Sequence, residues 1–496
     1  MSSLDKIREE RLKKKAFLED AGKDPYPAKA NRTANIADIL ADWKKHPGSK
    51  KQIAMTGRVF AVRGQGKVLF LDIKDESGSL QAVLRADNTH HFDRSVKSID
   101  IGDFVEIYGK AFVTKRGEKS IDAIKANVIT KAIRPIPSEW YGISDPETKY
   151  RQRYLELMID PDLREMFRMK TRFWSSMRKI LIEEGFLEVE TPVLEHVPGG
   201  ADAEPFKTKH NALDVDMYMR ISLEIALKKL VVGGFERVFE IGRVFRNEGI
   251  SAEHLQDYTQ MEMYWAYQDY KGLMMFIERM YKKVIKDTLG TLKTKRGETT
   301  INWGKKWEVI DYFTFFKKNT GLDLDKVGEK ELLAYARKLN LDTKKHPGKG
   351  RLIDLIFKQY RHKIVGPAFL IDPPVEIEPL AKRVEPGSNK VARFQVVAAG
   401  TELGKGFSEL NDPIDQMERF NEQQKMRDAG DAEAQRMDEE FVEALEYGMP
   451  PTAGFGTSER LFAVLLDKPV RDAVFFPTVR PPSKDKKRKG AEDKAK

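Results

Sequence analysis

The sequence predicts an α+β protein in which a small β domain precedes a larger mixed domain. Within residues 51–132, apolar and polar residues alternate in five short runs separated by glycine and aspartate, as in half-buried β-strands. From residue 151 onward, amphipathic helical patterns and strand patterns mix in one long region. A chain of 496 residues can bury a sizeable core even though only 41% of its residues are hydrophobic.

The first 50 residues are expected to form a helical extension. They are rich in Lys, Arg and Glu, and the apolar residues Leu4, Ile7, Leu12 and Leu18 are spaced as on one side of a helix. A solvated helix accounts for this pattern, and so does a helix that adds positive charge beside an RNA site.

Five strand candidates follow, and they are close enough in sequence to form one small closed barrel. An oligonucleotide-binding barrel has this form, but the strand count alone also fits any small β-barrel or sandwich. The prolines Pro135, Pro137 and Pro146 then mark residues 133–150 as a linker. The candidate strands are residues 53–62, 67–75, 79–85, 103–115 and 120–130.

Residues 151–482 are expected to form the larger domain. Its first long helix is predicted over residues 162–184, because apolar residues recur at helical spacing there and Gly185 follows its end. A Lys-rich stretch near residues 286–362 is interpreted as a helical insertion. Residues 483–496 are charge-rich and of low complexity, so we expect a basic disordered tail.

The composition excludes several kinds of chemistry. Without cysteine the chain has no disulfide, no thiolate nucleophile and no Cys-ligated metal, and it contains no GxxxxGK[ST], GxGxxG or HExxH motif. It has no apolar run of about 18 residues and no signal-peptide core, so we expect a cytoplasmic protein without a membrane segment. The net charge of +10 fits a polyanion partner such as RNA, although many basic proteins bind none.

The most informative stretch is FERVFEIGRVFRNEGISAEHLQDYTQMEMYWAY, which predicts a strand, a loop and a second strand. Because side chains two residues apart share a face, Glu240 and Arg246 lie on one face with Tyr258, Gln260 and Glu262. This face suits a pocket in which Arg246 binds phosphate, carboxylates bind a cation and Tyr258 stacks on a purine. A polar face turned to solvent is the alternative.

Two further stretches resemble parts of a site. In AAGTELGKGFSELNDP, Glu402 and Glu409 flank two glycines, and paired carboxylates beside phosphates suit Mg²⁺; a glycine-rich turn with two surface acids is equally consistent. In PPTAGFGTSERLFAVLLDK, glycines precede Arg460 at the start of an apolar helix, which would let the backbone approach a ligand. A strand-to-helix turn with a surface arginine is the alternative.

Together these stretches resemble the class II aminoacyl-tRNA synthetases and, within that class, the lysine-specific family. The similarity runs from about residue 30 to 482 and includes all three class motifs. The first is a helix followed by GFLEVETPVL, with Pro192 at the position used at the family's dimer interface. The second is the FRNE hairpin, and the third ends at Glu459 and Arg460. Other matching words are PGGADAEPF, HNALDVDMYMRIS and GFSELNDP.

The resemblance implies a fold and a function. The fold is a five-stranded OB-type anticodon-binding barrel over residues 51–132, followed by a class II antiparallel sheet flanked by helices. The function is a lysine–tRNA ligase, which activates L-lysine with ATP and Mg²⁺ to lysyl-adenylate and transfers lysine to the 3′ end of tRNA(Lys). A homodimer is implied as well.

The resemblance also implies roles for individual residues, with Arg246 and Arg460 as the catalytic pair. The implied ATP contacts are Arg246, Glu248, His254, Tyr258 and Arg460, and the implied metal ligand is Glu402. The implied lysine contacts are Gly200, Glu224, Glu262, Tyr264, Phe407 and Glu409. The implied anticodon contacts are Arg63, Phe70 and Gln81.

The sequence departs from the family pattern at several of these places. Gln395 stands where the family has a metal-binding Glu, Lys405 where it has Asn, and Leu255 where it has Asn, and the third motif is one residue shorter. Three alternatives therefore stay open: an aspartyl- or asparaginyl-type synthetase, a non-catalytic tRNA- or RNA-binding protein on the same fold, and the relative that lysylates a translation factor. That relative lacks the barrel, and the acidic Glu262 and Glu409 favour a cationic substrate.

Overall fold

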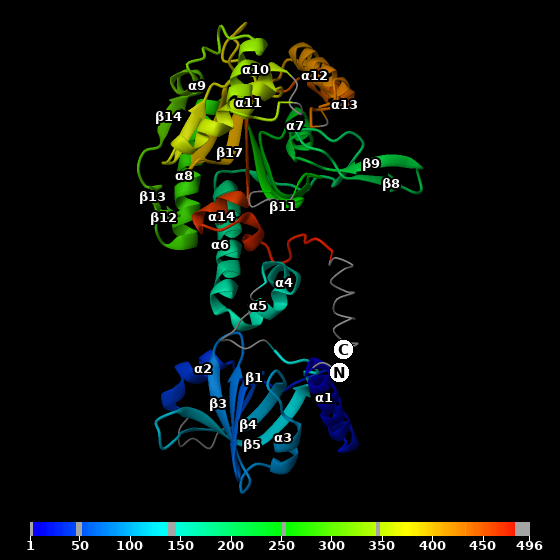
Figure 1. Cartoon of the computed structure of the whole chain (residues 1–496), viewed down its shortest axis with the longest axis vertical. Coiled ribbons are helices and arrows are strands. Elements are labelled where there is room, and N and C mark those ends of the chain that lie inside the picture. Colours follow the sequence, from blue (N-terminus) through cyan, green and yellow to red (C-terminus); the bar gives the residue numbers. More distant parts are fainter. Residues whose placement is uncertain are drawn as a thin grey trace. The chain divides into compact units, whose positions relative to one another are not determined.

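The computed structural model describes residues 3–45, 52–136, 145–249, 254–343, 348–431 and 433–481 (Figure 1). The chain divides into two compact units, which we describe separately. The first consists of residues 1–149, 154–159 and 480–496, and the second of residues 150–153 and 160–479. The predicted disordered tail, residues 483–496, lies outside the described residues, as does Pro137 of the predicted linker.

Five strands of the first unit form a closed barrel in the order β1-β2-β3-β5-β4, as the alternating pattern predicted. All neighbours are antiparallel except β3 and β5, which are parallel. The alternation is visible in β2, where Leu69, Leu71 and Ile73 are buried while the residues between them are partly exposed. The strands are β1 (Ile53–Gln65), β2 (Val68–Lys74), β3 (Ser79–Arg85), β4 (Phe104–Val113) and β5 (Lys119–Thr130).

The predicted N-terminal helix is present as α1 (Ser3–Asp20). Of the four apolar residues named above, Leu4 is 55% exposed and Ile7 and Leu12 are also exposed, whereas Leu18 is buried in the core of the barrel. Polar contacts hold the helix as well, because the buried Arg11 donates hydrogen bonds to the carbonyl oxygens of Ile101 (2.8 Å) and Arg134 (2.8 Å). The remaining helices before the linker are α2 (Ile36–Ala41), η1 (Trp43–Lys45) and α3 (Phe92–Ser98).

The second unit is built on an eight-stranded sheet in the order β14-β15-β16-β17-β18-β11-β10-β6 (Figure 1). It is antiparallel from β15 to β10, as predicted, and parallel only at its two edges, where β14 pairs with β15 and β6 with β10. Its strands are β6 (Leu187–Glu188), β10 (Arg237–Phe245), β11 (Asp257–Ala266), β14 (Glu308–Asp311), β15 (Ala368–Ile371), β16 (Arg393–Ala398), β17 (Thr401–Ser408) and β18 (Thr452–Ser458).

Smaller elements surround this sheet. Two small sheets contain β7 (Leu194–Glu195), β8 (Lys207–His210) and β9 (Val215–Met219), and β12 (Lys293–Arg296) and β13 (Thr299–Asn302). The helices of the second unit are α6 (Pro161–Glu183), α7 (Glu224–Val232), α8 (Tyr270–Leu289), α9 (Tyr312–Thr320), α10 (Glu329–Lys338), α11 (Lys349–Tyr360), η2 (Arg361–Lys363), η3 (Val375–Ile377), α12 (Pro413–Asp428), α13 (Glu439–Glu446), α14 (Arg460–Leu465) and η4 (Val470–Ala473). Most residues of α4 (Pro146–Arg151) and α5 (Arg153–Ile159) belong to the first unit. Among the described residues, none of these helices has the length and apolar character needed to cross a membrane.

Helix α6 matches the predicted first long helix within one residue at each end. Asp160 caps it by accepting hydrogen bonds from the backbone of Asp162 (2.9 Å) and Leu163 (3.0 Å), and Pro161 occupies its first turn. Gly185 follows its end at φ +87°, a conformation that glycine adopts without a Cβ clash.

The stretch 286–362 is not purely helical, which corrects the sequence-based interpretation. Its first residues belong to α8, and it contains the β12–β13 hairpin as well as β14, the edge strand of the main sheet. Among the described residues of this stretch, the helical additions are α9, α10, α11 and part of η2. The strands are four residues each, and β12 and β13 are rich in Lys and Thr, so their alternation was too short to be recognised.

Candidate active site

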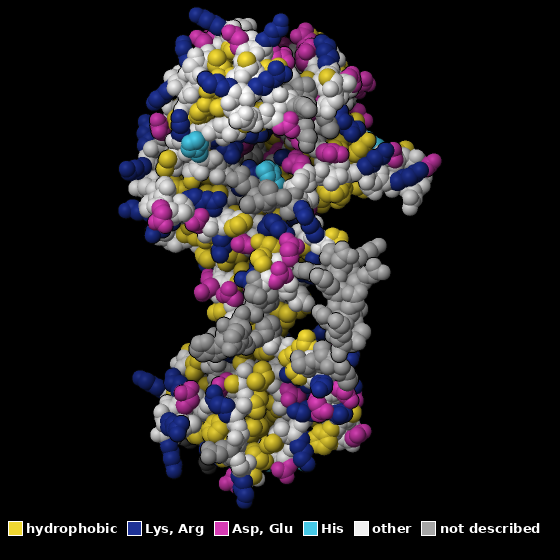
Figure 2. Space-filling view, viewed as in Figure 1, with side chains coloured by type: hydrophobic (Ala, Val, Ile, Leu, Met, Phe, Trp, Pro, Cys, Tyr) yellow, Lys and Arg dark blue, Asp and Glu magenta, His cyan; other side chains and the backbone are white. Residues whose placement is uncertain are grey.

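Two adjoining cavities lie on the large sheet, with volumes of about 610 and 230 Å³. They share part of one wall, which includes Arg246, Tyr258, Glu402, Lys405 and Arg460. Figure 2 shows the second unit hollowed on this side, with basic and acidic side chains around the opening. The sequence-predicted ATP and metal residues all line the larger cavity: Arg246, Glu248, His254, Tyr258, Gln395, Glu402 and Arg460. The predicted lysine residues all line the smaller one: Gly200, Glu224, Glu262, Tyr264, Phe407 and Glu409.

The register of the β10–β11 hairpin brings the predicted polar residues onto one face. Glu240 lies opposite Glu262, and Val244 lies opposite Tyr258. Gln260, Glu262 and Tyr258 line the smaller cavity, so this part of the face lines a pocket rather than bulk solvent. Glu240 is different: it is buried, pairs with Arg220 at 2.7 Å and supports the fold.

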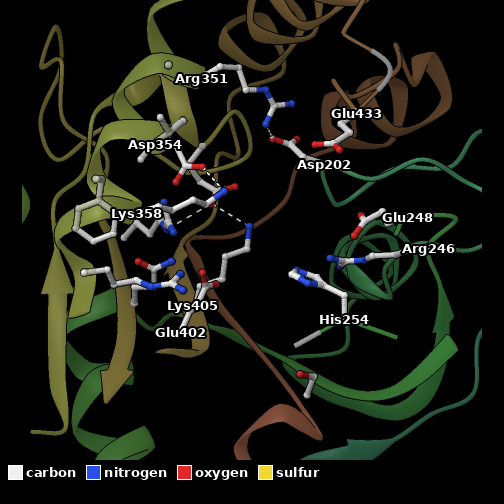
Figure 3. Close-up of a pocket in the computed structure, with 18 of the residues that line it drawn as sticks. Asp202, Arg246, Glu248, His254, Arg351, Asp354, Lys358, Glu402, Lys405 and Glu433 are labelled. Carbon is white, nitrogen blue, oxygen red and sulfur yellow. Dashed lines mark hydrogen bonds and ion pairs between the residues drawn. The ribbon is translucent and has the colours of Figure 1, made fainter. Parts of the chain in front are cut away.

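Arg246 follows β10 and is anchored beside an aromatic ring. Its Nε donates a hydrogen bond to the carbonyl oxygen of Ile221 (3.1 Å), and its guanidinium lies 5.6 Å from the centre of the Tyr258 ring. The backbone N–H of Arg246 also donates to Gln256 O at 2.7 Å. Figure 3 shows Arg246 with Glu248 and His254 on one side of the larger cavity, across from Lys405 and Glu402. This placement suits a phosphate held between the two sides.

Arg460 is positioned by the buried carboxylate that precedes it. Glu459 is 1% exposed and forms an ion pair with Lys170 of α6. The backbone N–H of Thr259 also donates to Glu459 Oε1 at 3.4 Å. Since Arg460 is the first residue of α14, these contacts fix the start of that helix and direct Arg460 to the wall shared by both cavities.

Glu262 forms the acidic floor of the smaller cavity and is held by neutral donors. The hydroxyls of Ser222 and Tyr264 donate to its carboxylate at 2.7 and 3.0 Å, and the amide of Gln260 donates at 2.5 Å. Its side chain is buried, with 3% of its surface exposed. A buried carboxylate whose bonded partners are all neutral favours a cationic ligand, because a cation restores the charge balance.

Lys228 is a residue that sequence reasoning missed, buried behind the carboxylates of Glu224 and Glu409 that line the smaller cavity. Its fully buried Nζ lies 2.5 Å from Glu224 Oε1 and also forms an ion pair with Glu409. The ammonium lies 5.4 Å from the centre of the Phe407 ring, within cation–π range. The spacing of Glu224 and Lys228, four residues apart on α7, is the signal that could have revealed it.

The acidic end of this pocket suits a ligand with two ammonium groups. There the three carboxylates of Glu224, Glu262 and Glu409, when ionised, carry two more charges than the single ammonium of Lys228 behind them balances. Burial raises the pKa of Glu224 to about 7, with Lys228 opposing the rise and Glu262 adding to it. Burial also raises the pKa of Glu409 well above its usual value. An α-ammonium and an ε-ammonium would together balance the two excess charges.

Two glycines make room for these side chains. Gly200 has φ +81°, and a Cβ there would lie 2.8 Å from Glu224 Cβ. Gly454 on β18 faces Tyr264 and Phe407 on its two neighbouring strands, and a Cβ there would lie 2.2 Å from Glu409 Oε1. The glycines seen in the sequence thus provide space for the acidic floor.

The possible metal ligands are fewer than the sequence spacing suggested. Glu402 lines both cavities, whereas Glu409 is tied to Lys228 in the smaller one. Gln395, buried on β16, offers only a neutral amide oxygen. Within the described parts of the chain, no group of three or more His, Cys, Asp or Glu residues is arranged to hold a metal ion. The residues fit one Mg²⁺ at Glu402 that completes its coordination with phosphate oxygens and water.

The larger cavity also has a wall that sequence reasoning missed. Arg351 of α11 donates to Asp202 at 2.9 Å and to Asp431 at 2.8 Å, and Lys358 of the same helix also lines the cavity. Arg351 and Lys358 belong to the stretch 286–362 that was interpreted as an insertion, and Asp202 and Asp431 contact it through Arg351. The helical periodicity of α11 indicates only that one side is buried, not that the other faces a ligand.

The predicted anticodon residues meet on one outer face of the barrel. Arg63 lies opposite Phe70 in the β1–β2 register, and Asp72 lies opposite Gln81 in the β2–β3 register. Since Phe70 and Asp72 are two apart on β2, all four side chains share a face. Arg63 is exposed and contacts Asp72 at 2.7 Å, and Gln81 accepts a hydrogen bond from Ser120 at 3.0 Å. A ring flanked by polar groups suits an unpaired base.

Comparison with known proteins places the chain in a family. The family model for class II tRNA synthetases (D, K and N) matches residues 145–480, and the model for the OB-fold nucleic acid binding domain matches residues 53–129. The lysine–tRNA ligase of Thermoanaerobacter sp. (strain X514) is 41% identical over 97% of both chains. That of Roseiflexus castenholzii is 42% identical over 96% of this chain and 99% of its own, and that of Thermotoga maritima is 40% identical over 96% and 97%. The chain therefore belongs to the class II tRNA synthetases, within the lysine–tRNA ligase group.

Proposed function

We propose that this protein is a lysine–tRNA ligase, which activates L-lysine with ATP and transfers it to the 3′ end of tRNA(Lys). The observation that carries the proposal is the smaller cavity, where the buried Glu262 has only neutral bonded partners and the lining also includes Arg246 and Arg460. A bound lysine would place its ε-ammonium toward the acidic floor and its carboxylate toward Arg246. An acidic or uncharged side chain would leave the carboxylates of that floor unbalanced.

In the proposed first step, a lysine carboxylate oxygen bonds to the α-phosphorus of ATP and the bond from that phosphorus to the bridging oxygen breaks. Pyrophosphate leaves with the electron pair. Arg246 holds both reacting groups and stabilises the added negative charge, while Arg460 and Tyr258 flank the nucleotide. Mg²⁺ held by Glu402 would neutralise phosphate charge. The tRNA hydroxyl then attacks the adenylate carbonyl, and AMP leaves.

The proposal is tested by charging purified tRNA(Lys) with radiolabelled lysine, with aspartate and asparagine as competing substrates on their own tRNAs. We expect charging with lysine alone. Charging of tRNA(Asp) or tRNA(Asn) would assign the protein to a neighbouring specificity. Tight tRNA binding with no charging of any tRNA would identify a non-catalytic binding protein.

Lysine binding is expected to strengthen as the pH rises through about 7. Burial raises the pKa of Glu224 to about 7 and also raises the pKa of Glu409. Below this range the carboxyls are protonated, so bound lysine must displace protons to gain its charge partners. Isothermal titration calorimetry from pH 6 to 8, in buffers with different ionisation enthalpies, should show proton release on lysine binding. An affinity independent of pH, without proton release, would contradict this.

Anticodon binding is expected to depend on Phe70. Phe70→Ala should raise the KM for tRNA(Lys) about 10- to 100-fold, because it removes a stacking platform worth about 1–3 kcal/mol per base. Lysine-dependent ATP–pyrophosphate exchange should be unchanged, since Phe70 lies in the barrel and the cavities lie in the other unit. Val96→Ala, at an exposed residue on α3 in the same unit, serves as the control. An unchanged tRNA KM would remove Phe70 from the anticodon site.

We also propose a homodimer that uses the surface around Pro192. Leu187, Val193 and Leu194 are 46%, 38% and 45% exposed in the single chain, which is unusual for large apolar residues clustered along the sequence. A second copy covering them would bury this surface. Sedimentation velocity of the full chain measures the oligomeric state directly.

A further inference from the structure

Lys405 occupies a position in the active site that the assigned roles do not explain. It lies on β17 between Glu402 and Phe407, and it lines both cavities. Its side chain is 36% exposed. Figure 3 shows it beside Glu402, across the cavity from Arg246. In the proposed reaction the lysine carboxylate and the α-phosphate would meet between Arg246 and Lys405.

Lys405 shares its carboxylate partner with a second cation. Its Nζ donates to Glu378 Oε2 at 3.0 Å, and Arg393 Nε lies 3.4 Å from the same oxygen. Two cations thus share one carboxylate, whose side chain is only 4% exposed. Across the strands, Lys405 lies opposite Gln395, which adds no charge.

The ammonium is held in its charged form. Burial acts to lower the pKa of Lys405, but the charges of Glu378, Glu224 and Glu402 together raise that pKa above its usual value. Burial also disfavours the charged form of Glu378 and acts to raise its pKa, yet the charges of Lys405 and Arg393 keep that pKa below its usual value. Glu378 is therefore ionised and already shared between two cations, so it has no charge to spare for a metal ion.

A second divalent cation would find little on this wall to hold it. Mg²⁺ binds through carboxylates together with phosphates. Among the described residues of β16 and β17, Glu402 is the one carboxylate that lines the cavities, and no ion pair joins it to a described Lys or Arg of the chain. The neighbouring ammonium would also repel a metal placed beside Gln395.

We propose that Lys405 is a catalytic cation of the adenylation step, whose ammonium contacts the α-phosphate and lysine carboxylate and supplies charge that a second metal ion would otherwise supply. This inference rests on the proposed function. While the carboxylate oxygen bonds to phosphorus and pyrophosphate leaves, Lys405 keeps its proton and moves from Glu378 toward the phosphate oxygens. The ammonium stabilises the transition state most, because negative charge accumulates on the phosphate oxygens at that point. The active site then works with a single Mg²⁺, at Glu402.

The first test measures lysine-dependent ATP–pyrophosphate exchange by Lys405→Gln and Lys405→Arg. Lys405→Gln should lower kcat about 100- to 1,000-fold, the usual effect of removing one preorganised donor to a developing charge. Lys405→Arg keeps the charge and should retain more activity than Lys405→Gln. Lys283→Gln, at an exposed lysine paired with Asp287 on α8, is the control and should match the wild type. A Lys405→Gln kcat within about threefold of the wild type would overturn the proposal.

The second test counts metal ions without turnover. Electron paramagnetic resonance with Mn²⁺, lysine and α,β-methylene ATP should find one Mn²⁺ per active site in the wild type. The double variant Gln395→Glu/Lys405→Asn, which removes the ammonium and adds a carboxylate, should bind two. Two ions in the wild type, or one in the double variant, would overturn the inference. The metal count measures binding and does not depend on exchange. A wild-type protein that lacks lysine-driven exchange would therefore overturn the proposed function, whichever metal count is found.

Discussion

Arg246→Ala is expected to lower lysine-dependent ATP–pyrophosphate exchange by about 1,000-fold or more. Arg246 is the one basic side chain that follows directly from the β10–β11 hairpin into the wall shared by both cavities. Its place there allows one guanidinium to contact the lysine carboxylate and the α-phosphate together. Removing it takes away several charge-assisted hydrogen bonds that strengthen in the transition state, each worth about 2.7–4 kcal/mol.

The same hairpin offers a matched control for Arg246. Arg243 lies on β10 with its side chain 45% exposed and paired with Asp257, and it lines neither cavity. Arg243→Ala should therefore leave exchange within about twofold of the wild type, because exposed ion pairs contribute little. Activity retained by Arg246→Ala, or an equal loss in both variants, would contradict the assigned role.

Glu262→Gln is expected to raise the KM for lysine about 100-fold or more and to leave the KM for ATP within about threefold. The substitution keeps the size of the side chain but removes the one pocket carboxylate whose bonded partners are all neutral. The substrate ammonium would then be buried without its charge partner, a loss of about 3–5 kcal/mol. Steady-state exchange kinetics with lysine and ATP varied separately measure both constants.

The control for Glu262 is an acid of the same size away from the cavities. Glu278 on α8 pairs with Lys282 at 2.5 Å along the helix surface, and Glu278→Gln should leave both constants unchanged. A lysine KM that is unaffected in Glu262→Gln would remove this carboxylate from substrate recognition. A matching rise in the ATP KM would indicate a distorted site rather than a lost charge.

The active-site face was predictable because strand geometry has a fixed period. Once residues 235–267 were recognised as a hairpin, the period of two placed Tyr258, Gln260 and Glu262 on one face, and the structure pairs that face with β10 as expected. The barrel was predictable for the same reason. Its five alternating runs correspond to five strands within a few residues at each end.

Other parts were not predictable because they depend on contacts that are distant in sequence. Lys228 pairs with Glu409, far along the chain, so only its spacing from Glu224 was visible. Arg351 belongs to the cavity because α11 packs near Asp202, a contact that no local pattern records. The apolar spacing of α1 predicted a helix but not its contacts, since Arg11 holds it through the backbone carbonyl groups of Ala132 and Ile101.

The most direct test of the whole account is ATP–pyrophosphate exchange by the purified full-length protein with each of the twenty amino acids in turn. The acidic pocket and the shared arginine wall predict exchange that is driven by lysine far more strongly than by any other amino acid, at a specificity of about 1,000-fold or more over aspartate and asparagine. Exchange driven by aspartate or asparagine, or none with any amino acid, would contradict it.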